Sequence, residues 1–479
     1  MLLRHTLLYM PAQIIGPLFQ LIAMIVWTHI VNDHTLGVIT LVTATHELLQ
    51  IGLLAWWSQF VLRFLGRFDA DGTSSRFYPT ETVVMLTSVI LQSLAMIAIL
   101  RWVIVPDADA ALQIAAICYV VTRSFNLYIA ERARVRQRIG IYTIQQIVGP
   151  AAGFLIGVVL IRWLGQRPEW PLAGYAIAQF VAAIIVLPKL RCSFRLQSID
   201  RNIIRHALQY GFPLIVGGAL SWVGLNASRF VVNDMLGVAA AGLFAVGYGL
   251  GQRAAAVAAM LVTAAAFPLA VKRMEESGSK AAMEQLAQNS ALLVAILAPS
   301  IIGIFVLRTE IVTLLIAAPF QQITLSVLPL AVLAGAIRNF RAHFGDQVFL
   351  LHSHTRMMMA ISGIDAVMSV ILGIACVSLW GVVGGAIATV VAAAVAAAAS
   401  FTIGFRAFDL TLPIGHLLRI SLATAAMAVA LQLLSEASSY VMLAAHIAFG
   451  AAIYGVALSV LYAPMLSRQL RHRLQRSGA

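Results

Sequence analysis

Five arginines lie inside apolar runs that are long enough to cross a bilayer. They are Arg123, Arg229, Arg253, Arg338 and Arg341. A guanidinium group at the bilayer centre costs about 2.5–3.5 kcal/mol on insertion scales, so these side chains are expected to face a wet cavity or a partner. Arginine suits phosphate through its bidentate donors, which makes an anion the expected ligand. The alternative is structural, because an arginine can also snorkel or brace neighbouring helices through backbone carbonyl groups.

Fewer acids than arginines are expected within the membrane. Glu47, Asp346 and Asp365 lie in the same kind of apolar run, so pairing alone would leave an excess of two positive charges. Arg338 and Arg341 are three residues apart, which predicts that they share one face of a helix. The sequence therefore predicts a cationic cavity near the middle of the membrane.

Titratable residues in these runs are candidates for ion coupling. They are His46, Glu47, His343, Asp346 and Asp365. Ionisable groups within a membrane often carry coupling ions, and histidine titrates near neutral pH. The simpler alternative is that these residues only neutralise nearby arginines, and we favour it for His46, Glu47, Asp346 and Asp365. The same two roles, ion coupling and neutralisation, stay open for His343.

The elements that must position these groups are transmembrane helices. Of the 479 residues, 61% are hydrophobic and 11% are charged, against about 25% charged residues in soluble domains. Recurrent apolar runs of about twenty residues predict an all-α polytopic membrane protein. No small-residue cleavage site follows the first run, which is therefore interpreted as a retained helix. Fourteen helices are predicted, at residues 8–31, 37–60, 81–104, 110–130, 141–162, 171–189, 209–232, 238–270, 286–307, 324–349, 357–379, 381–404, 417–434 and 440–463.

The basic residues between these helices gather on one side. The chain has 32 lysines and arginines and a net charge of +13. Apart from the five arginines inside helices, only four fall on the other side, namely Arg101, Arg162, Arg167 and Arg308. The remaining 23 include Arg63, Arg67, Arg132, Arg201 and Arg205. Positive residues mark the cytoplasmic side, so both termini are predicted to be cytoplasmic.

A related phrase occurs in each half of the chain. "VNDHTLGV" stands at residues 31–38 and "VNDMLGV" at residues 232–238. Each is expected to form the turn between the first two helices of its half, on the non-cytoplasmic side. Two six-helix bundles in a parallel pseudo-twofold repeat follow, with the substrate site between them. The predicted parts are an N-terminal bundle (1–190), a cytoplasmic linker (191–208), a C-terminal bundle (209–404), and accessory helices 13 and 14 with a basic cytoplasmic tail (405–479).

Prolines and glycines interrupt corresponding helices of the two halves. Pro11 and Gly16-Pro17 in the first helix match Pro213 and Gly217-Gly218 in the seventh. Such interruptions predict bendable, site-forming helices, although neighbouring helices can also support a simple kink. The run "GYGLGQ" before Arg253 consists of small residues that are expected to leave room for a water-filled lumen.

Signals of other protein classes are missing from the sequence. It contains no GxxxxGK[ST], HExxH or GxSxG motif, and no segment between predicted helices exceeds about twenty residues. Cys118, Cys192 and Cys376 are too few and too scattered for a disulfide framework or a metal site. The basic residues are explained as topology signals. We therefore expect no enzyme, no cofactor, no metal and no nucleic-acid partner.

One long run of this sequence resembles a known family. The run is 208–253, "LQYGFPLIVGGALSWVGLNASRFVVNDMLGVAAAGLFAVGYGLGQR". Its opening Tyr210-Gly211-x-Pro213-Leu214, its Arg229 and its later Ala241-Gly242-Leu243-Phe244 resemble helices 7 and 8 of bacterial polysaccharide flippases of the Wzx type. These belong to the multidrug/oligosaccharidyl-lipid/polysaccharide exporter superfamily. Relatives often have an acid before the helix 7 arginine, whereas this chain has Ser228.

The resemblance implies a flippase that moves an undecaprenyl-pyrophosphate-linked oligosaccharide across the bacterial inner membrane. The translocated oligosaccharide would supply the assembly of O-antigen, which is part of lipopolysaccharide, or of exopolysaccharide. Transport would be by alternating access coupled to a proton or sodium gradient, because no nucleotide site exists. A polysaccharide polymerase and a chain-length regulator would be possible partners.

Three other functions stay open. A peptidoglycan-precursor flippase has similar chemistry. A multidrug antiporter belongs to the same superfamily, but cationic drugs require acids that the first helix lacks. A membrane polymerase or acyltransferase is expected to have a long non-cytoplasmic loop with titratable residues, which this chain does not have.

Overall fold

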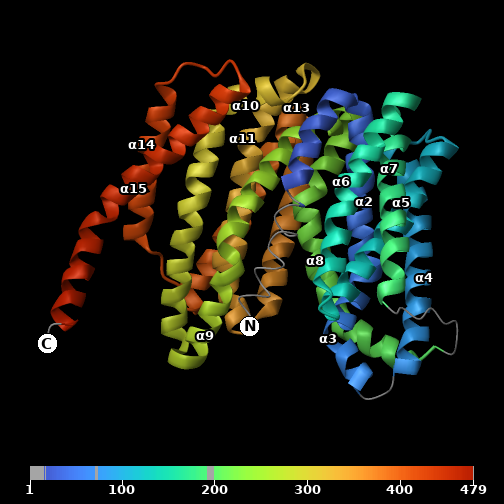
Figure 1. Ribbon diagram of the computed structural model, residues 1–479, viewed down its shortest axis with the longest axis horizontal. Coiled ribbons are helices and arrows are strands. Elements are labelled where there is room, and N and C mark those ends of the chain that lie inside the picture. The colour runs from blue at the N-terminus through green and yellow to red at the C-terminus, as the bar shows by residue number, and fades with distance from the viewer. Residues whose placement is uncertain (1–15, 17, 71–73, 191–198, 478–479) are drawn as a thin grey trace. The chain divides into compact units, whose positions relative to one another are not determined.

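The structure is a computed structural model that describes residues 16, 18–70, 74–190 and 199–477 (Figure 1). These residues form helices and no strands. After a first helix at Leu18–Ile30, the elements are α2 (Asp33–Gln50), η1 (Ile51–Ala55), α3 (Trp56–Ala70), α4 (Ser74–Ile99), η2 (Leu100–Ile104), α5 (Ala110–Val135), α6 (Ile139–Leu164), α7 (Glu169–Val186), η3 (Leu187–Leu190), α8 (Arg201–Leu236), α9 (Val238–Val306), α10 (Arg308–Leu315), α11 (Ala318–Phe340), η4 (Arg341–Gly345), α12 (Asp346–Leu351), α13 (Thr355–Ala407), α14 (Ile414–Gln432) and α15 (Tyr440–Ser477).

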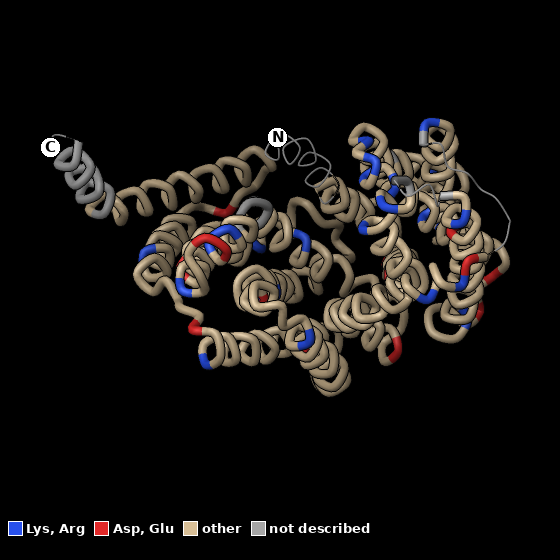
Figure 2. The backbone as a smooth tube through the Cα atoms, turned by 90° about the horizontal axis from the view of Figure 1, so that it is seen from below, with Lys and Arg blue, Asp and Glu red and all other residues tan. Residues whose placement is uncertain are grey.

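The predicted fold class is confirmed for the described part of the chain. Eleven of its helices are long and apolar enough to cross a membrane, and the helix at Leu18–Ile30 is shorter. Two long helices contain a non-helical residue, Gly278 in α9 and Gly381 in α13, at which each divides into two. Most of the tube in Figure 2 is tan because charged residues are sparse. The number of fourteen spans stays a prediction.

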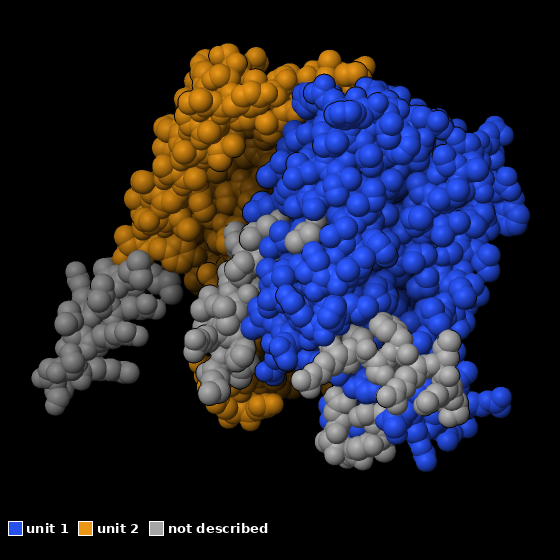
Figure 3. All heavy atoms as spheres, turned by 45° about the vertical axis from the view of Figure 1, so that its right-hand side comes forward, with its two compact units in different colours: residues 1–246, 362–389 blue, residues 247–361, 390–479 orange. Residues whose placement is uncertain are grey.

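The chain forms two compact units, which Figure 3 distinguishes by colour. Unit 1 comprises residues 1–246 and 362–389, and unit 2 comprises residues 247–361 and 390–479. The predicted six-helix bundles divide the chain at other points, and their pseudo-twofold relation stays a prediction. In unit 1, α5, α6 and α7 pack side by side (Figure 1).

The two related phrases both lie where one helix gives way to the next, but their local structures differ. Asn32 caps α2, and its side-chain oxygen accepts a hydrogen bond from the Thr35 amide at 2.8 Å. Asn233 instead lies within α8 and donates to the Val103 carbonyl at 2.7 Å. Here the helix ends at Gly237, whose φ of 87° suits glycine.

The phrases also bring α2 and the start of α9 together within unit 1. A Cβ atom on Gly37 would stand 2.1 Å from the Val238 carbonyl oxygen, and one on Gly242 would stand 2.0 Å from the Asp33 carbonyl oxygen. Only glycine permits backbones to approach this closely. The contact explains why residues 238–246 belong to unit 1 although the rest of α9 belongs to unit 2.

The predicted interruption of the seventh helix is not a break. Helix α8 is continuous from Arg201 to Leu236 and includes Pro213. It begins eight residues before the predicted start at 209, because the Asp200 side chain caps it by accepting from the amides of Asn202 and Ile203. The corresponding Pro11 and Pro17 lie outside the described residues.

A buried ion pair joins α4 to α5 in unit 1. Arg132, predicted between helices, lies within α5 with 1% of its side chain exposed and pairs with Glu81 of α4. Arg132 also donates to the Tyr128 hydroxyl at 2.8 Å, and its guanidinium carbon lies 5.1 Å from the Tyr78 ring centre. Glu81 is the first residue of the helix predicted at 81–104, whereas α4 begins at Ser74 and places Glu81 two turns inside the helix.

Removing only one partner of this pair should destabilise the protein. We expect Glu81→Ala to cost about 3–5 kcal/mol, because the Arg132 guanidinium would stay buried without its carboxylate. Thermal unfolding of the purified protein in detergent measures the effect. The double variant Glu81→Leu/Arg132→Met removes both charges and should recover most of the loss. Equal melting temperatures of Glu81→Ala and the wild type would contradict this role.

Candidate functional site

Arg123 lies half-buried in α5, beside a buried chain of hydrogen bonds in unit 1. His46 of α2 is 3.1 Å from the Ser124 hydroxyl, which donates to the Gln92 side-chain oxygen of α4 at 2.7 Å. Because the hydroxyl has one proton and gives it to Gln92, His46 is assigned as the donor through Nε2. Arg123 is close enough to interact electrostatically with His46. Glu47, the next residue, is exposed.

Asp365 lies buried between α13 and α8 in the same unit. Its carboxyl group occupies the space left by Gly224, where a Cβ atom would stand 3.1 Å from the Asp365 Cγ. Ser369, one turn further along α13, donates to the Gly224 carbonyl at 3.1 Å and lies 3.5 Å from the carboxylate. Arg229 is half-buried in α8, five residues after Gly224. Asp365 is therefore held at a helix–helix contact.

Arg341 and Asp346 form a buried ion pair in unit 2. Arg341 Nε lies 3.3 Å from one carboxylate oxygen, and the Ser400 hydroxyl of α13 donates to the other at 2.7 Å. Arg341 opens the π-helical segment η4, which also contains the half-buried His343. Single-turn π-helical segments are frequent at functional sites. The predicted neutralisation of an arginine by Asp346 is thus observed.

Arg338 is buried where α11 packs against α9 in unit 2. Its Nη1 lies 3.4 Å from the Tyr248 hydroxyl, and Gln252 of α9 donates to the Ala331 carbonyl at 3.2 Å. A Cβ atom on Gly251 would stand 2.6 Å from the Ala331 Cβ, so α9 and α11 touch at this glycine. The small residues of "GYGLGQ" therefore form a packing contact, and the prediction that they leave room for a lumen is wrong for Gly247 and Gly251. Arg253, just beyond them, is half-buried.

The candidate residues are distributed over both units. Unit 1 holds two arginines and two acids together with His46, namely Arg123, Arg229, Glu47 and Asp365. Unit 2 holds three arginines and one acid together with His343, namely Arg253, Arg338, Arg341 and Asp346. The excess of positive charge that the sequence predicts therefore belongs to the helices of unit 2. Whether the arginines line one cavity stays a prediction.

The hydrogen-bonding partners of these residues were not predicted from the sequence. Tyr248, Ser400, Ser124 and Gln92 each hydrogen-bond to a candidate residue or to its neighbour from another helix. Single hydroxyl or amide side chains are common in apolar helices, so their types alone gave no signal. Among the described residues, no group of three or more His, Cys, Asp or Glu side chains could hold a metal ion.

The contact between α9 and α11 can be tested at Gly251. We expect Gly251→Val to overpack this contact, to separate Tyr248 from Arg338 and to cost about 1–3 kcal/mol. The matched control is Gly455→Val in α15, because no atom lies within 4 Å of a Cβ at that position. Thermal unfolding in detergent compares the two variants. Equal melting temperatures would show that Gly251 is not a packing contact.

Comparison with known proteins identifies relatives of this chain. The model of the family described as "Polysaccharide biosynthesis protein" matches residues 2–274, which is more than half of the sequence. A search of curated proteins finds no match.

Several solved structures share the fold. The lipid II flippase MurJ in an inward closed conformation matches with a TM-score of 0.74 and 14% identity, over 96% of this chain and 100% of that chain. An inward-facing multidrug resistance MATE family transporter of the MOP superfamily matches with a TM-score of 0.58 and 16% identity, over 82% and 94% of the two chains. A MOP superfamily transporter from Pyrococcus furiosus matches with a TM-score of 0.58 and 15% identity, over 85% and 95%. At these identities the likeness shows a common fold.

Proposed function

Since this chain belongs to the polysaccharide biosynthesis protein family, we propose that it is a flippase for polyprenyl-pyrophosphate-linked oligosaccharides. Its membrane is the bacterial inner membrane, and both termini lie in the cytoplasm. The translocated units supply O-antigen or exopolysaccharide assembly. The fold shared with MurJ and MATE transporters supports a transporter rather than an enzyme.

The observation that carries this proposal is the set of five interior arginines against the three interior acids Glu47, Asp346 and Asp365; the buried pair of Glu81 and Arg132 adds one charge of each sign. The pairing of Arg341 with Asp346 leaves the formal excess of positive charge unchanged. A diphosphate carries the opposite charge and matches the fork of donors that arginine presents. In the proposed mechanism the arginines bind the diphosphate and sugars while the lipid tail stays in the bilayer. The two halves then rock to expose the site to the other side.

A lipid II flippase is the second candidate. It is favoured by the match to MurJ, which extends over nearly all of both chains. A polyprenyl-linked head group is common to both candidates, so the interior arginines do not distinguish them. Identification of the lipid-linked glycan that accumulates after deletion does: a peptidoglycan precursor would support the second candidate, and an O-antigen or exopolysaccharide unit would support the first.

Neutralising single interior arginines should abolish transport. We expect Arg123→Gln, Arg229→Gln, Arg253→Gln, Arg338→Gln and Arg341→Gln each to lose about tenfold or more of the surface polysaccharide, since each removes a charge-assisted contact to phosphate. Surface polysaccharide per unit of membrane-inserted protein is the measurement. Arg134→Gln is the matched control, because this arginine is exposed in the same helix as Arg123. Normal polysaccharide from all five variants would refute an arginine-lined site.

Transport should respond to an ion gradient, with His46, Glu47, His343, Asp346 and Asp365 as the candidate coupling groups. We expect an imposed sodium or proton gradient to accelerate the entry of a fluorescent lipid-linked oligosaccharide into vesicles. Asp365→Asn or Asp346→Asn should remove that acceleration because the amide has no charge to exchange. Glu275→Gln, an exposed position in α9, is the control. Rates indifferent to both gradients would contradict coupling.

A further inference from the structure

The motif that opens the second half of the sequence builds a contact between α3 and α8 in unit 1. A Cβ atom on Gly211 would stand 2.5 Å from the Trp56 Cβ, so the two helices touch at this point. Tyr210, the residue before it, lies beside Arg63 of α3. The transport mechanism above does not use this contact, and none of the five interior arginines belongs to it.

Aromatic rings also pack between the last turns of α3 and the first turns of α8. Phe64 of α3 lies 5.1 Å from the His206 ring and 5.4 Å from the Tyr210 ring, measured between ring centres. Phe60, one turn earlier, lies 5.4 Å from His206. Residues four apart share one face of a helix, so the rings form a ladder between the two helices.

Two arginines stack on this ladder. The guanidinium carbon of Arg63 lies 5.6 Å from the Phe64 ring centre and 5.3 Å from that of Tyr210. The guanidinium carbon of Arg67 lies 5.6 Å from the Phe64 ring centre. Stacking on an aromatic face restricts a guanidinium group but leaves its N–H edges directed away from the ring. Both arginines are exposed, so these edges are accessible to a ligand.

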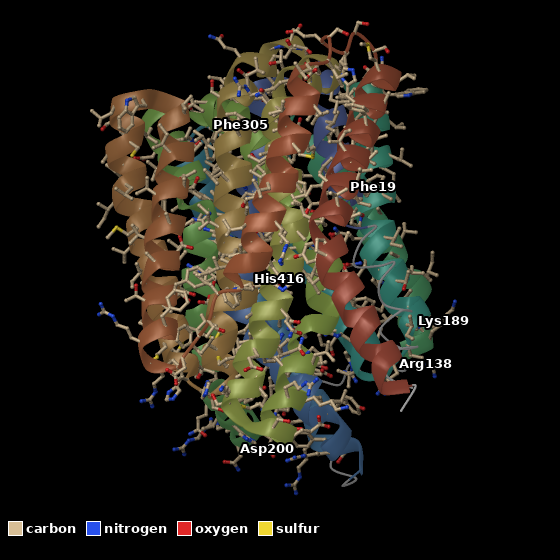
Figure 4. The ribbon with its side chains drawn as sticks, turned by 90° about the vertical axis from the view of Figure 1, so that its left-hand side faces the viewer. Phe19, Arg138, Lys189, Asp200, Phe305 and His416 are labelled. Atoms are coloured by element: carbon tan, nitrogen blue, oxygen red, sulfur yellow. The ribbon has the colours of Figure 1, made fainter. Side chains whose placement is uncertain are left out.

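The place of Arg63 and Arg67 at the end of a long span predicts that they lie near the lipid head groups. The span Asp33–Phe68 has 36 residues and is about 54 Å long, against a hydrocarbon core of about 30 Å. Arg63 and Arg67 are in its last two turns, and His206 is in the first two turns of α8. Arg138, Lys189 and Asp200 lie at the same end of unit 1 (Figure 4). This is the end that the distribution of basic residues predicts to be cytoplasmic.

The exposed side chains on the neighbouring first turns of α8 are mostly basic. Arg201, Arg205 and His206 are exposed on the first turns of α8. Asp200 is engaged as the cap of that helix. Asp69 and Asp71 follow Arg67 in the sequence; only the backbone of Asp69 is described, and Asp71 lies outside the described residues. Among the described side chains, Arg201 and Arg205 of α8 therefore add two positive charges to those of Arg63 and Arg67 on α3.

We propose that Arg63, Phe64, Arg67, His206 and Tyr210 form an interfacial binding site, the α3–α8 patch, for the diphosphate of a polyprenyl-linked sugar. The patch binds the head group at the cytoplasmic surface, before the head group enters the membrane interior. The nature of the ligand rests on the proposed function, whereas the patch itself rests on the contacts between α3 and α8. Two guanidinium groups one helical turn apart provide a donor pair for each of two linked phosphates, and a diphosphate offers them more charge and more acceptor oxygens than the single phosphate of a phospholipid.

Equilibrium binding in nanodiscs of phosphatidylcholine tests this site. The probe is a radiolabelled fifteen-carbon polyprenyl diphosphate linked to N-acetylglucosamine. We expect Arg63→Gln/Arg67→Gln to weaken binding about tenfold or more, because it removes charge-assisted donors. Phe64→Leu keeps the charges but removes the ring, and should weaken binding several-fold. The control Arg134→Gln/Arg138→Gln removes the same charge from exposed positions of the same unit and should bind like the wild type.

Three results would overturn the proposal. The first is that the wild type does not bind the probe. The second is that the patch double variant and the control double variant bind the probe equally well. The third is that the wild type loses probe binding when phosphatidylglycerol replaces phosphatidylcholine in the nanodiscs. The last result would identify a general surface for anionic lipids. An Arg123→Gln background separates this proposal from the transport function: Arg63→Gln/Arg67→Gln should weaken probe binding by the same factor there as in the wild type, because the patch and the interior arginine act independently. If the wild type binds the probe at the patch but transports no lipid-linked oligosaccharide, the proposed function fails and the binding site stands.

Discussion

The cost of placing charge in hydrocarbon is the constraint on which the rest of this structure depends. Each ionised side chain within the membrane needs a partner or water, because lipid offers neither hydrogen bonds nor counter-charge. Arg341 meets this need with Asp346 and Ser400, and Arg132 meets it with Glu81 and Tyr128. In both cases one polar group comes from another helix, Ser400 from α13 and Glu81 from α4. Polar contacts therefore help to determine which helices pack together.

Close packing at glycine makes these polar contacts possible. Gly251 lets α9 approach α11, which brings the Tyr248 hydroxyl to Arg338. Gly224 leaves the space that the Asp365 carboxyl group occupies. In a membrane the apolar surfaces of helices gain little from leaving lipid, so van der Waals contact at small residues supplies much of the association. The glycines and the charges thus act together in both units.

The sequence predicted the class of the fold and the family, because long apolar runs and the motif around Tyr210-Gly211 are local features. It also predicted the pairing of Asp346 with an arginine. It could not predict which side of a helix a small residue faces, so Gly251 was interpreted as lining a lumen. The helix predicted from residue 81 begins at Ser74, and the interruption predicted at Pro213 lies within a continuous helix, since neighbouring helices support a proline inside a membrane helix. Glu81 stood at the predicted end of a helix and was therefore not counted among the interior acids. The arrangement of the halves and the roles of the arginines depend on contacts between distant segments and stay predictions.

The two related phrases show how similar residues acquire different structural roles. Asn32 begins a helix by accepting a backbone hydrogen bond, whereas Asn233 lies inside a helix and donates to the carbonyl of Val103. The glycine of the first phrase, Gly37, is buried inside α2, but that of the second, Gly237, ends α8. Gly37 nevertheless touches Val238, the last residue of the second phrase, so the phrases meet in space. The two phrases therefore contact each other although their local structures differ. Similar sequences in the two halves do not require that the two halves contribute equally to a site.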